Sequence, residues 1–188
     1  MENNIFVNFL GEVDDRNIGQ LLRTMYSASQ NRAQLFVLGI ASPGGKTKLG
    51  MAGYWGLLST GMNITTHNLG YVDSAAMSLF LAGSRRSAPR GSTFFIHPAM
   101  MRLGDSGVMH YGAKALTRMA DELEKDNETL LDRLEERTNL KRRQAARYLH
   151  ASKRFTAEEA LKVGIIHSIE EFTLPANAEV ILISPPAT

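Results

Sequence analysis

Asn68-Leu-Gly-Tyr-Val-Asp-Ser74-Ala-Ala-Met-Ser-Leu-Phe-Leu-Ala-Gly83 is the stretch that decides the fold. It begins as an apolar strand and turns abruptly into a helix of small and apolar residues. A serine at this junction lies in the positive field of the helix N-terminus, and the N–H of Ala75 points to the same side. That geometry suits an acyl-transfer nucleophile. Taken alone, the junction is better explained by Ser74 or Asp73 serving as a helix N-cap.

Strands and helices alternate on both sides of this stretch. Apolar, β-prone runs bounded by glycine, proline or small polar residues occupy residues 5–10, 34–41, 63–70 and 93–97. Helical patterns lie between them at residues 17–29, 48–60 and 74–82. The alternation predicts an α/β fold made of βαβ units with a largely parallel sheet.

The pattern changes after residue 97. A glycine-containing stretch at residues 101–112 precedes a long helix at 113–137, whose apolar residues recur every three or four positions. A shorter helix is predicted at 141–150, a capping box at Thr156 and Glu159, a helix end at Gly164 and a strand at 165–169. The tail, 175–188, is predicted to hold a terminal strand and a loose end. We expect residues 1–188 to form one domain.

Composition excludes several classes of protein. The chain has 188 residues, 21 lysines and arginines against 19 acids, and no cysteine. The near balance of charge gives no footprint for nucleic acid or an anionic membrane, and the lack of cysteine removes disulfides, thiolate zinc sites and a cysteine nucleophile. No signal peptide or apolar run of membrane-spanning length is visible. We expect a cytoplasmic protein with no metal and no cofactor.

The segment Gly39-Ile-Ala-Ser-Pro-Gly-Gly45-Lys-Thr47 has two interpretations. It ends like a phosphate-binding loop, but that motif needs a glycine where Ile40 stands, so nucleotide binding is not predicted. Alternatively, its glycines expose backbone N–H groups that stabilise the negative charge developing on a carbonyl oxygen. Alone, the segment is best explained as a Pro-Gly turn.

His97 closes a predicted buried strand just before a proline. Catalytic side chains of open α/β folds gather at the carboxyl ends of strands. A lone histidine there is more often structural, and His97 becomes a candidate general base only in combination with Ser74.

The ordered set of motifs resembles the proteolytic subunit of the Clp protease. Ser-Pro-Gly-Gly after a strand is followed by Gly-x3-Ser-x8-Gly, Ile-His-Pro and Phe-Thr-Ala-Glu-Glu-Ala-x3-Gly-Ile-Ile. Each motif is weak alone, but the set in this order is specific and runs from about Phe6 to Glu171. The resemblance implies the ClpP/crotonase fold, with repeated ββα units and a protruding helix-strand handle at about residues 99–137.

The resemblance also implies the roles of residues and the assembly. Ser74 would be the nucleophile of a serine endopeptidase, His97 its base, and the N–H groups of Gly44 and Ala75 the oxyanion hole. Peptide or unfolded-protein substrates would pair their backbone beside Gly45, Lys46 and Thr47. The handle would join homo-oligomers, two stacked heptameric rings enclosing a chamber, with no role for nucleic acid or a membrane.

Two departures from the family pattern qualify this. The triad aspartate is replaced by Ser152, leaving Asp105 of the handle as a substitute acid and Lys153 as a less favoured base. In the serine-protease template, neutralising that aspartate lowers turnover roughly 10⁴-fold, so we expect weak activity. The family's N-terminal axial-loop segment is also missing, which leaves open whether a Clp ATPase is a partner. The alternatives are a catalytically silent subunit beside an active paralogue and, less favoured, a crotonase-type acyl-CoA enzyme.

Overall fold

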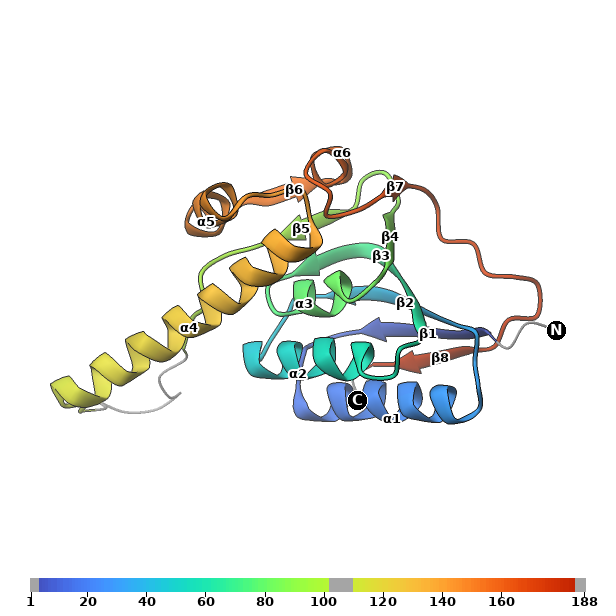
Figure 1. The fold of residues 1–188 in the computed structure, drawn as a ribbon, viewed down its shortest axis with the longest axis horizontal. Helices are drawn as coiled ribbons and strands as arrows, with labels where there is room; N and C mark the ends of the chain where they lie inside the picture. Colours follow the sequence, from blue (N-terminus) through green and yellow to red (C-terminus); the bar gives the residue numbers. More distant parts are fainter. Residues whose placement is uncertain (1–3, 102–109, 185–188) are drawn as a thin grey trace.

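Three parallel strands form the centre of an eight-stranded sheet in the computed structural model, which describes residues 4–101 and 110–184 (Figure 1). These strands are β1 (Asn4–Leu10), β2 (Leu35–Ser42) and β3 (Asn63–Asp73). Strand β2 lies between the other two and is almost entirely buried, which explains its continuous apolar sequence. The sheet order is β6-β5-β3-β2-β1-β8; in addition, β4 pairs with β3, and β7 pairs with β4.

Strand β3 is the longest strand and has two different neighbours along one edge. Its first half pairs with β4 (Arg85–Ala88), and its last residues, Tyr71–Asp73, pair with β5 (Thr93–Phe95). On the other edge, the register with β2 shifts between Ile40 and Ser42. The carboxyl ends of β2, β3 and β5 therefore lie close together. The predicted site residues come just after these three strand ends.

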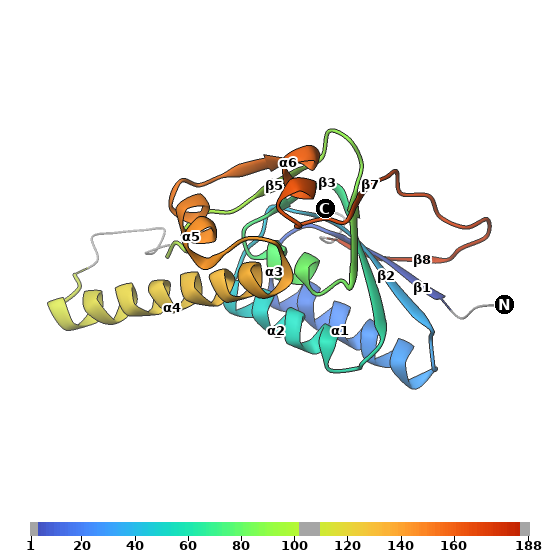
Figure 2. The same ribbon diagram turned by 45° about the horizontal axis from the view of Figure 1, so that its top comes forward.

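Helices α1 (Asp15–Gln30) and α2 (Thr47–Leu58) cover one face of the sheet (Figures 1 and 2). The short helix α3 (Ala76–Leu81) follows β3 directly and is wholly buried. Helix α2 approaches it closely at Gly50, where a Cβ atom would lie 2.6 Å from the carbonyl oxygen of Ala75. Only glycine permits this approach, which fixes α2 beside the turn at the end of β3.

Helix α4 (Ala113–Arg137) projects away from the sheet, with its first half extending beyond the rest of the described chain (Figures 1 and 2). Only its second half is anchored, by the buried residues Asn127, Leu131 and Leu134. Helix α5 (Arg142–His150) then leads to β6 (Arg154–Thr156), which pairs antiparallel with β5.

The chain ends with α6 (Ala157–Lys162), β7 (Ser168–Ile169) and β8 (Val180–Ile183). Strand β8 pairs parallel with β1 and closes that edge of the sheet. None of the helices in residues 4–101 and 110–184 is both long and apolar enough to cross a membrane.

The structure confirms the predicted α/β class, the parallel central strands and the capping box at the start of α6, where the Thr156 hydroxyl accepts from the Glu159 N–H. Several predicted boundaries were wrong. Helix α3 begins at Ala76, not at Ser74, and β5 ends at Phe95, two residues before His97. Strand β7 is shorter than the predicted strand at 165–169, and β4 and β6 were not predicted.

Buried Arg86 explains why the polar stretch at β4 is a strand. Its guanidinium donates to the carbonyl oxygens of Ile165, Gly83, Arg137 and Gly164 at 2.7, 2.9, 2.6 and 3.0 Å. The side chain is only 3% exposed, and burial lowers its pKa to about 10. Arg86 thus ties β4 to the ends of α3, α4 and α6.

Candidate active site

Ser74 occupies the turn between β3 and α3 with φ of +54°, in the left-handed region that non-glycine residues rarely adopt. Its N–H donates to the carbonyl oxygen of Phe95 on β5 at 2.7 Å, and its carbonyl accepts from the N–H of Met77 at 2.9 Å. The serine is therefore held from both sides by backbone hydrogen bonds. A strained strand-to-helix turn of this kind presents a serine hydroxyl outward, as nucleophile turns do.

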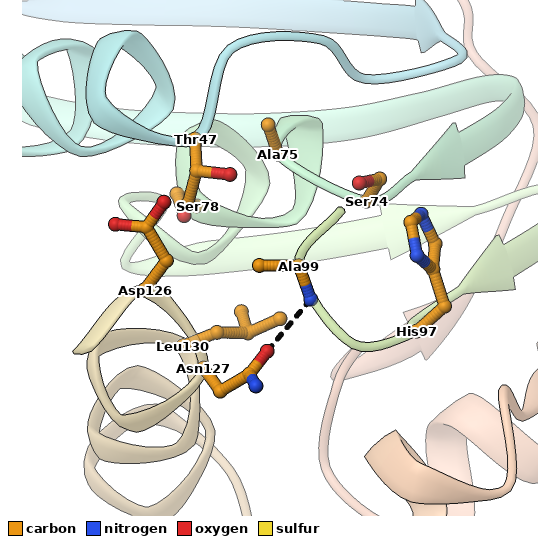
Figure 3. A pocket seen from close by; sticks show the side chains of 9 residues that line it. All are labelled: Thr47, Ser74, Ala75, Ser78, His97, Ala99, Asp126, Asn127 and Leu130. Atoms are coloured by element: carbon orange, nitrogen blue, oxygen red, sulfur yellow. Dashed lines mark hydrogen bonds between the residues drawn. The ribbon is translucent and has the colours of Figure 1, made fainter. Parts of the chain in front are cut away.

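His97 lines the same pocket as Ser74 (Figure 3). Its Nδ1 atom lies 2.8 Å from the carbonyl oxygen of Pro98, and its ring stacks on Phe95 with centroids 5.1 Å apart. Because a carbonyl oxygen only accepts, Nδ1 must carry the proton, and Nε2 of the neutral ring is then free to accept one. Among the described residues, no hydrogen bond joins the ring to the Ser74 hydroxyl.

Ser152 lies two residues before β6 begins, and His97 lies two residues after β5 ends. Strands β5 and β6 pair Phe95 with Arg154, and beyond them the Ile96 N–H donates to the Lys153 carbonyl at 3.0 Å. The pairing ends there, because the Lys153 N–H bonds to the carbonyl oxygen of Tyr148 at 3.0 Å and the Ser152 N–H to that of Leu149 at 2.9 Å. Ser152 is exposed and has φ of +49°.

The other charged candidates are placed differently. The Lys153 ammonium pairs with Glu159 at 2.7 Å, and the Asp73 carboxylate faces Arg154 at 3.3 Å. Burial raises the pKa of Asp73, with Arg154 and His97 acting in the opposite direction. Asp105 falls at 102–109, outside the described residues. Within those residues, the acceptor for His97 is therefore a neutral carbonyl.

Gly44 and Ala75 lie in direct contact. A Cβ atom at Gly44, whose φ is +91°, would lie 2.7 Å from the Cβ of Ser74 and 3.0 Å from the Ala75 nitrogen. The Ala75 N–H has no acceptor among the described residues. The Gly44 N–H donates to the hydroxyl of Ser42 at 3.1 Å, so it would have to exchange that partner to stabilise an oxyanion.

Gly45, Lys46 and Thr47 line a larger cleft of about 630 Å³ between the β2–α2 connection and α4. The Gly44 carbonyl and the Lys46 N–H bond to Val13 in a short parallel bridge at 2.7 and 2.9 Å. Because bonding groups alternate along a strand, the N–H and carbonyl of Gly45 face away from Val13. That orientation leaves a short backbone edge beside the cleft.

Two residues of α4 were missed by the sequence analysis. The Asn127 amide oxygen accepts from the Ala99 N–H at 2.7 Å and so fixes the segment after His97, while Asp126 lines the pocket of Ser74 and His97 (Figure 3). Both stand three or four positions from the apolar residues Leu123 and Leu130. Their position on the apolar face of an amphipathic helix was the signal that could have found them.

Comparison with known proteins agrees with this architecture. The family model of the Clp protease matches residues 1–172, which is most of the chain. The chain therefore belongs to the Clp protease family, a family of peptidases.

A distant sequence relative supports the same family. The chain is 29% identical over 167 residues to the protein named ATP-dependent Clp protease proteolytic subunit 2 of Thermobifida fusca. The similarity covers 86% of this chain and 78% of that protein.

Proposed function

We propose that the protein is a serine-type endopeptidase subunit that hydrolyses unfolded proteins or peptides inside a ring-shaped chamber. The observation that carries the proposal is the convergence of Ser74 and His97 on one pocket, with Ser74 in a left-handed turn. Ser74 Oγ attacks the scissile carbonyl carbon, and His97 Nε2 takes its proton and then gives it to the leaving amine. Water then attacks the acyl-enzyme; His97 Nε2 takes its proton and gives it to Ser74 Oγ as the ester bond breaks.

Backbone donors stabilise the oxyanion. The free N–H of Ala75 supplies one donor, and the N–H of Gly44 supplies the second once it exchanges the Ser42 hydroxyl for the oxyanion at 3.1 Å or less. The substrate lies extended along Gly45 and pairs with its free N–H and carbonyl, so that the scissile bond reaches Ser74.

The uncovered half of α4 supports an oligomer. Leu116 is 49% exposed, and the buried residues of α4 all lie in its second half. An amphipathic helix whose apolar face is left exposed by the described residues, 4–101 and 110–184, is suited to pack on another chain. We propose that α4 is the handle that joins two stacked heptameric rings, as the resemblance implies, and that the protein is cytoplasmic. Whether a Clp ATPase docks on the rings is a separate question.

A catalytically silent subunit is the second candidate. It is favoured by the hydrogen-bond partner of His97 Nδ1, which is the neutral Pro98 carbonyl, and by Ser152 at the position that the family pattern gives to an aspartate. That carbonyl selects the tautomer but does not stabilise the imidazolium that forms during the reaction.

Labelling with a fluorophosphonate probe distinguishes the two candidates. The oligomeric wild-type protein is incubated with the probe, and Ser74→Ala serves as the control. Labelling of the wild type alone, with hydrolysis of an unfolded protein such as casein that is lost in the variant, supports the peptidase. Equal labelling of both proteins, without hydrolysis, supports the silent subunit.

A further inference from the structure

Asp126 stands out because it is a carboxylate in an otherwise neutral pocket. The pocket beside the nucleophile is lined by Thr47, Ser74, Ala75, Ser78, His97, Ala99, Asp126, Asn127 and Leu130 (Figure 3). Asp126 is its one acidic member. The carboxylate comes from α4, on the side of the pocket across from the Ser74 turn.

The Asp126 carboxylate is left without a close partner. No side chain within residues 4–101 and 110–184 forms a hydrogen bond or an ion pair within 4 Å with it. Lys48, whose charge lowers the pKa of Asp126, pairs with Glu122 at 3.5 Å, one turn earlier on α4. Two carboxylates thus share one ammonium, so this wall carries an uncompensated negative charge.

Partial burial of the Asp126 carboxylate also favours a cation beside it. Asp126 is half-buried, and burial together with Glu122 raises its pKa. A half-buried carboxylate with a raised pKa gains from any cation brought beside it, because that cation replaces lost hydration.

Asp126 lies between the two cavities, so a cation on a side chain of a bound peptide could reach it. Asp126 and Thr47 line both the narrow pocket at Ser74, about 20 Å³, and the cleft of about 630 Å³ that would hold the peptide. A side chain next to the scissile bond therefore passes Thr47 before it reaches the carboxylate. The small volume of the pocket at Ser74 favours an unbranched side chain over a β-branched or aromatic one.

We infer that Asp126 selects substrates with lysine on the acyl side of the scissile bond. This inference rests on the proposed peptidase function and adds a specificity residue to it. The lysine methylene groups lie along Thr47 and Leu130, and the ammonium replaces solvent at the Asp126 carboxylate.

The test compares peptides that differ at that single position. Fluorogenic peptides carrying lysine, norleucine or glutamate are assayed for kcat/KM with the wild type, Asp126→Asn and Asp121→Asn. Norleucine has the length of lysine without its charge. Asp121→Asn removes the same charge from an exposed position of α4 that lines neither cavity.

For the wild type and Asp121→Asn, we expect kcat/KM to be about tenfold higher for the lysine peptide than for the norleucine peptide, and lowest for the glutamate peptide. A preference of about tenfold lies between the contribution of an exposed ion pair and that of a desolvated one. Asp126→Asn is expected to bring the kcat/KM values for the lysine and norleucine peptides close to parity. A wild type without preference for lysine, or an Asp126→Asn protein that keeps it, overturns the inference.

Binding separates this inference from the proposed function. Fluorescence anisotropy of the same peptides on the Ser74→Ala protein, with and without Asp126→Asn, needs no turnover. If the wild type neither hydrolyses a peptide nor reacts with the fluorophosphonate, the peptidase proposal fails. The lysine preference in binding, present or absent, still decides the role of Asp126.

Discussion

Ser152→Asp is the substitution that most sharply examines how His97 is oriented. The pairing of β5 with β6 extends to a bond between Ile96 and Lys153, the chain neighbours of His97 and Ser152, and Ser152 has φ of +49°. Aspartate and asparagine both tolerate this left-handed conformation, so Ser152→Asp and Ser152→Asn differ in charge but hardly in shape or backbone cost.

The expected gain is set by exposure. A buried orienting aspartate is worth roughly 10⁴ in turnover in the serine-protease template, but position 152 is exposed. The Pro98 carbonyl already fixes the tautomer of His97 through its 2.8 Å contact with Nδ1. What remains is the stabilisation of the imidazolium by a charged acceptor, about 1.5–3 kcal/mol. We therefore expect kcat to rise about tenfold to a hundredfold.

The assay is kcat for a fluorogenic peptide at neutral pH, measured for the wild type, Ser152→Asp and Ser152→Asn. The increase should belong to aspartate alone. If Ser152→Asn accelerates the reaction as much as Ser152→Asp, or if neither does, then residue 152 does not face Nδ1 and the reasoning is refuted.

Three further predictions concern the turn, the buried arginine and a buried histidine. Gly44→Ala should abolish labelling of Ser74, because the new Cβ would lie 2.7 Å from the serine Cβ at a φ of +91°; intact far-ultraviolet circular dichroism would show that the fold survives. Arg86→Met should lower the free energy of unfolding by about 3 kcal/mol in urea titrations by leaving buried carbonyls unpaired, whereas a change above 1 kcal/mol for exposed Arg85→Met would argue against this cause. Burial lowers the pKa of His67 to about 4, so the unfolded chain binds more protons than the folded one below pH 6.5. The free energy of unfolding should therefore fall by about 3 kcal/mol as the pH drops from 6.5 to 4. A His67→Asn protein with the same pH dependence would contradict this.

The sequence was a good guide to the central sheet because its strands are uniformly apolar. Strand β2, Leu35–Ser42, is buried along nearly its whole length, and such a run has few alternatives to a central parallel strand. Strand β4 was missed because Arg85-Arg86-Ser87 looks like a surface loop. The carbonyl oxygens of two distant segments, at Arg137 and at Gly164–Ile165, make the burial of Arg86 tolerable, and no local pattern encodes them.

The site could be predicted only as far as its residues follow strands directly. Ser74 and His97 follow the ends of the neighbouring strands β3 and β5 within two residues, so topology brings them to one edge. Asp126 and Asn127 reach the same pocket from a helix some 30 residues further along the chain, and that approach depends on tertiary packing. The engagement of the Gly44 N–H by Ser42 is likewise a matter of side-chain geometry.

Mass-spectrometric mapping of the fluorophosphonate adduct tests the central claim most directly. The wild-type oligomer should carry one adduct per chain, located on Ser74, and His97→Gln should react far more slowly because its side chain cannot accept the serine proton. An adduct on another residue, or equal reactivity of the wild type and His97→Gln, would contradict the assignment of these two residues as nucleophile and base.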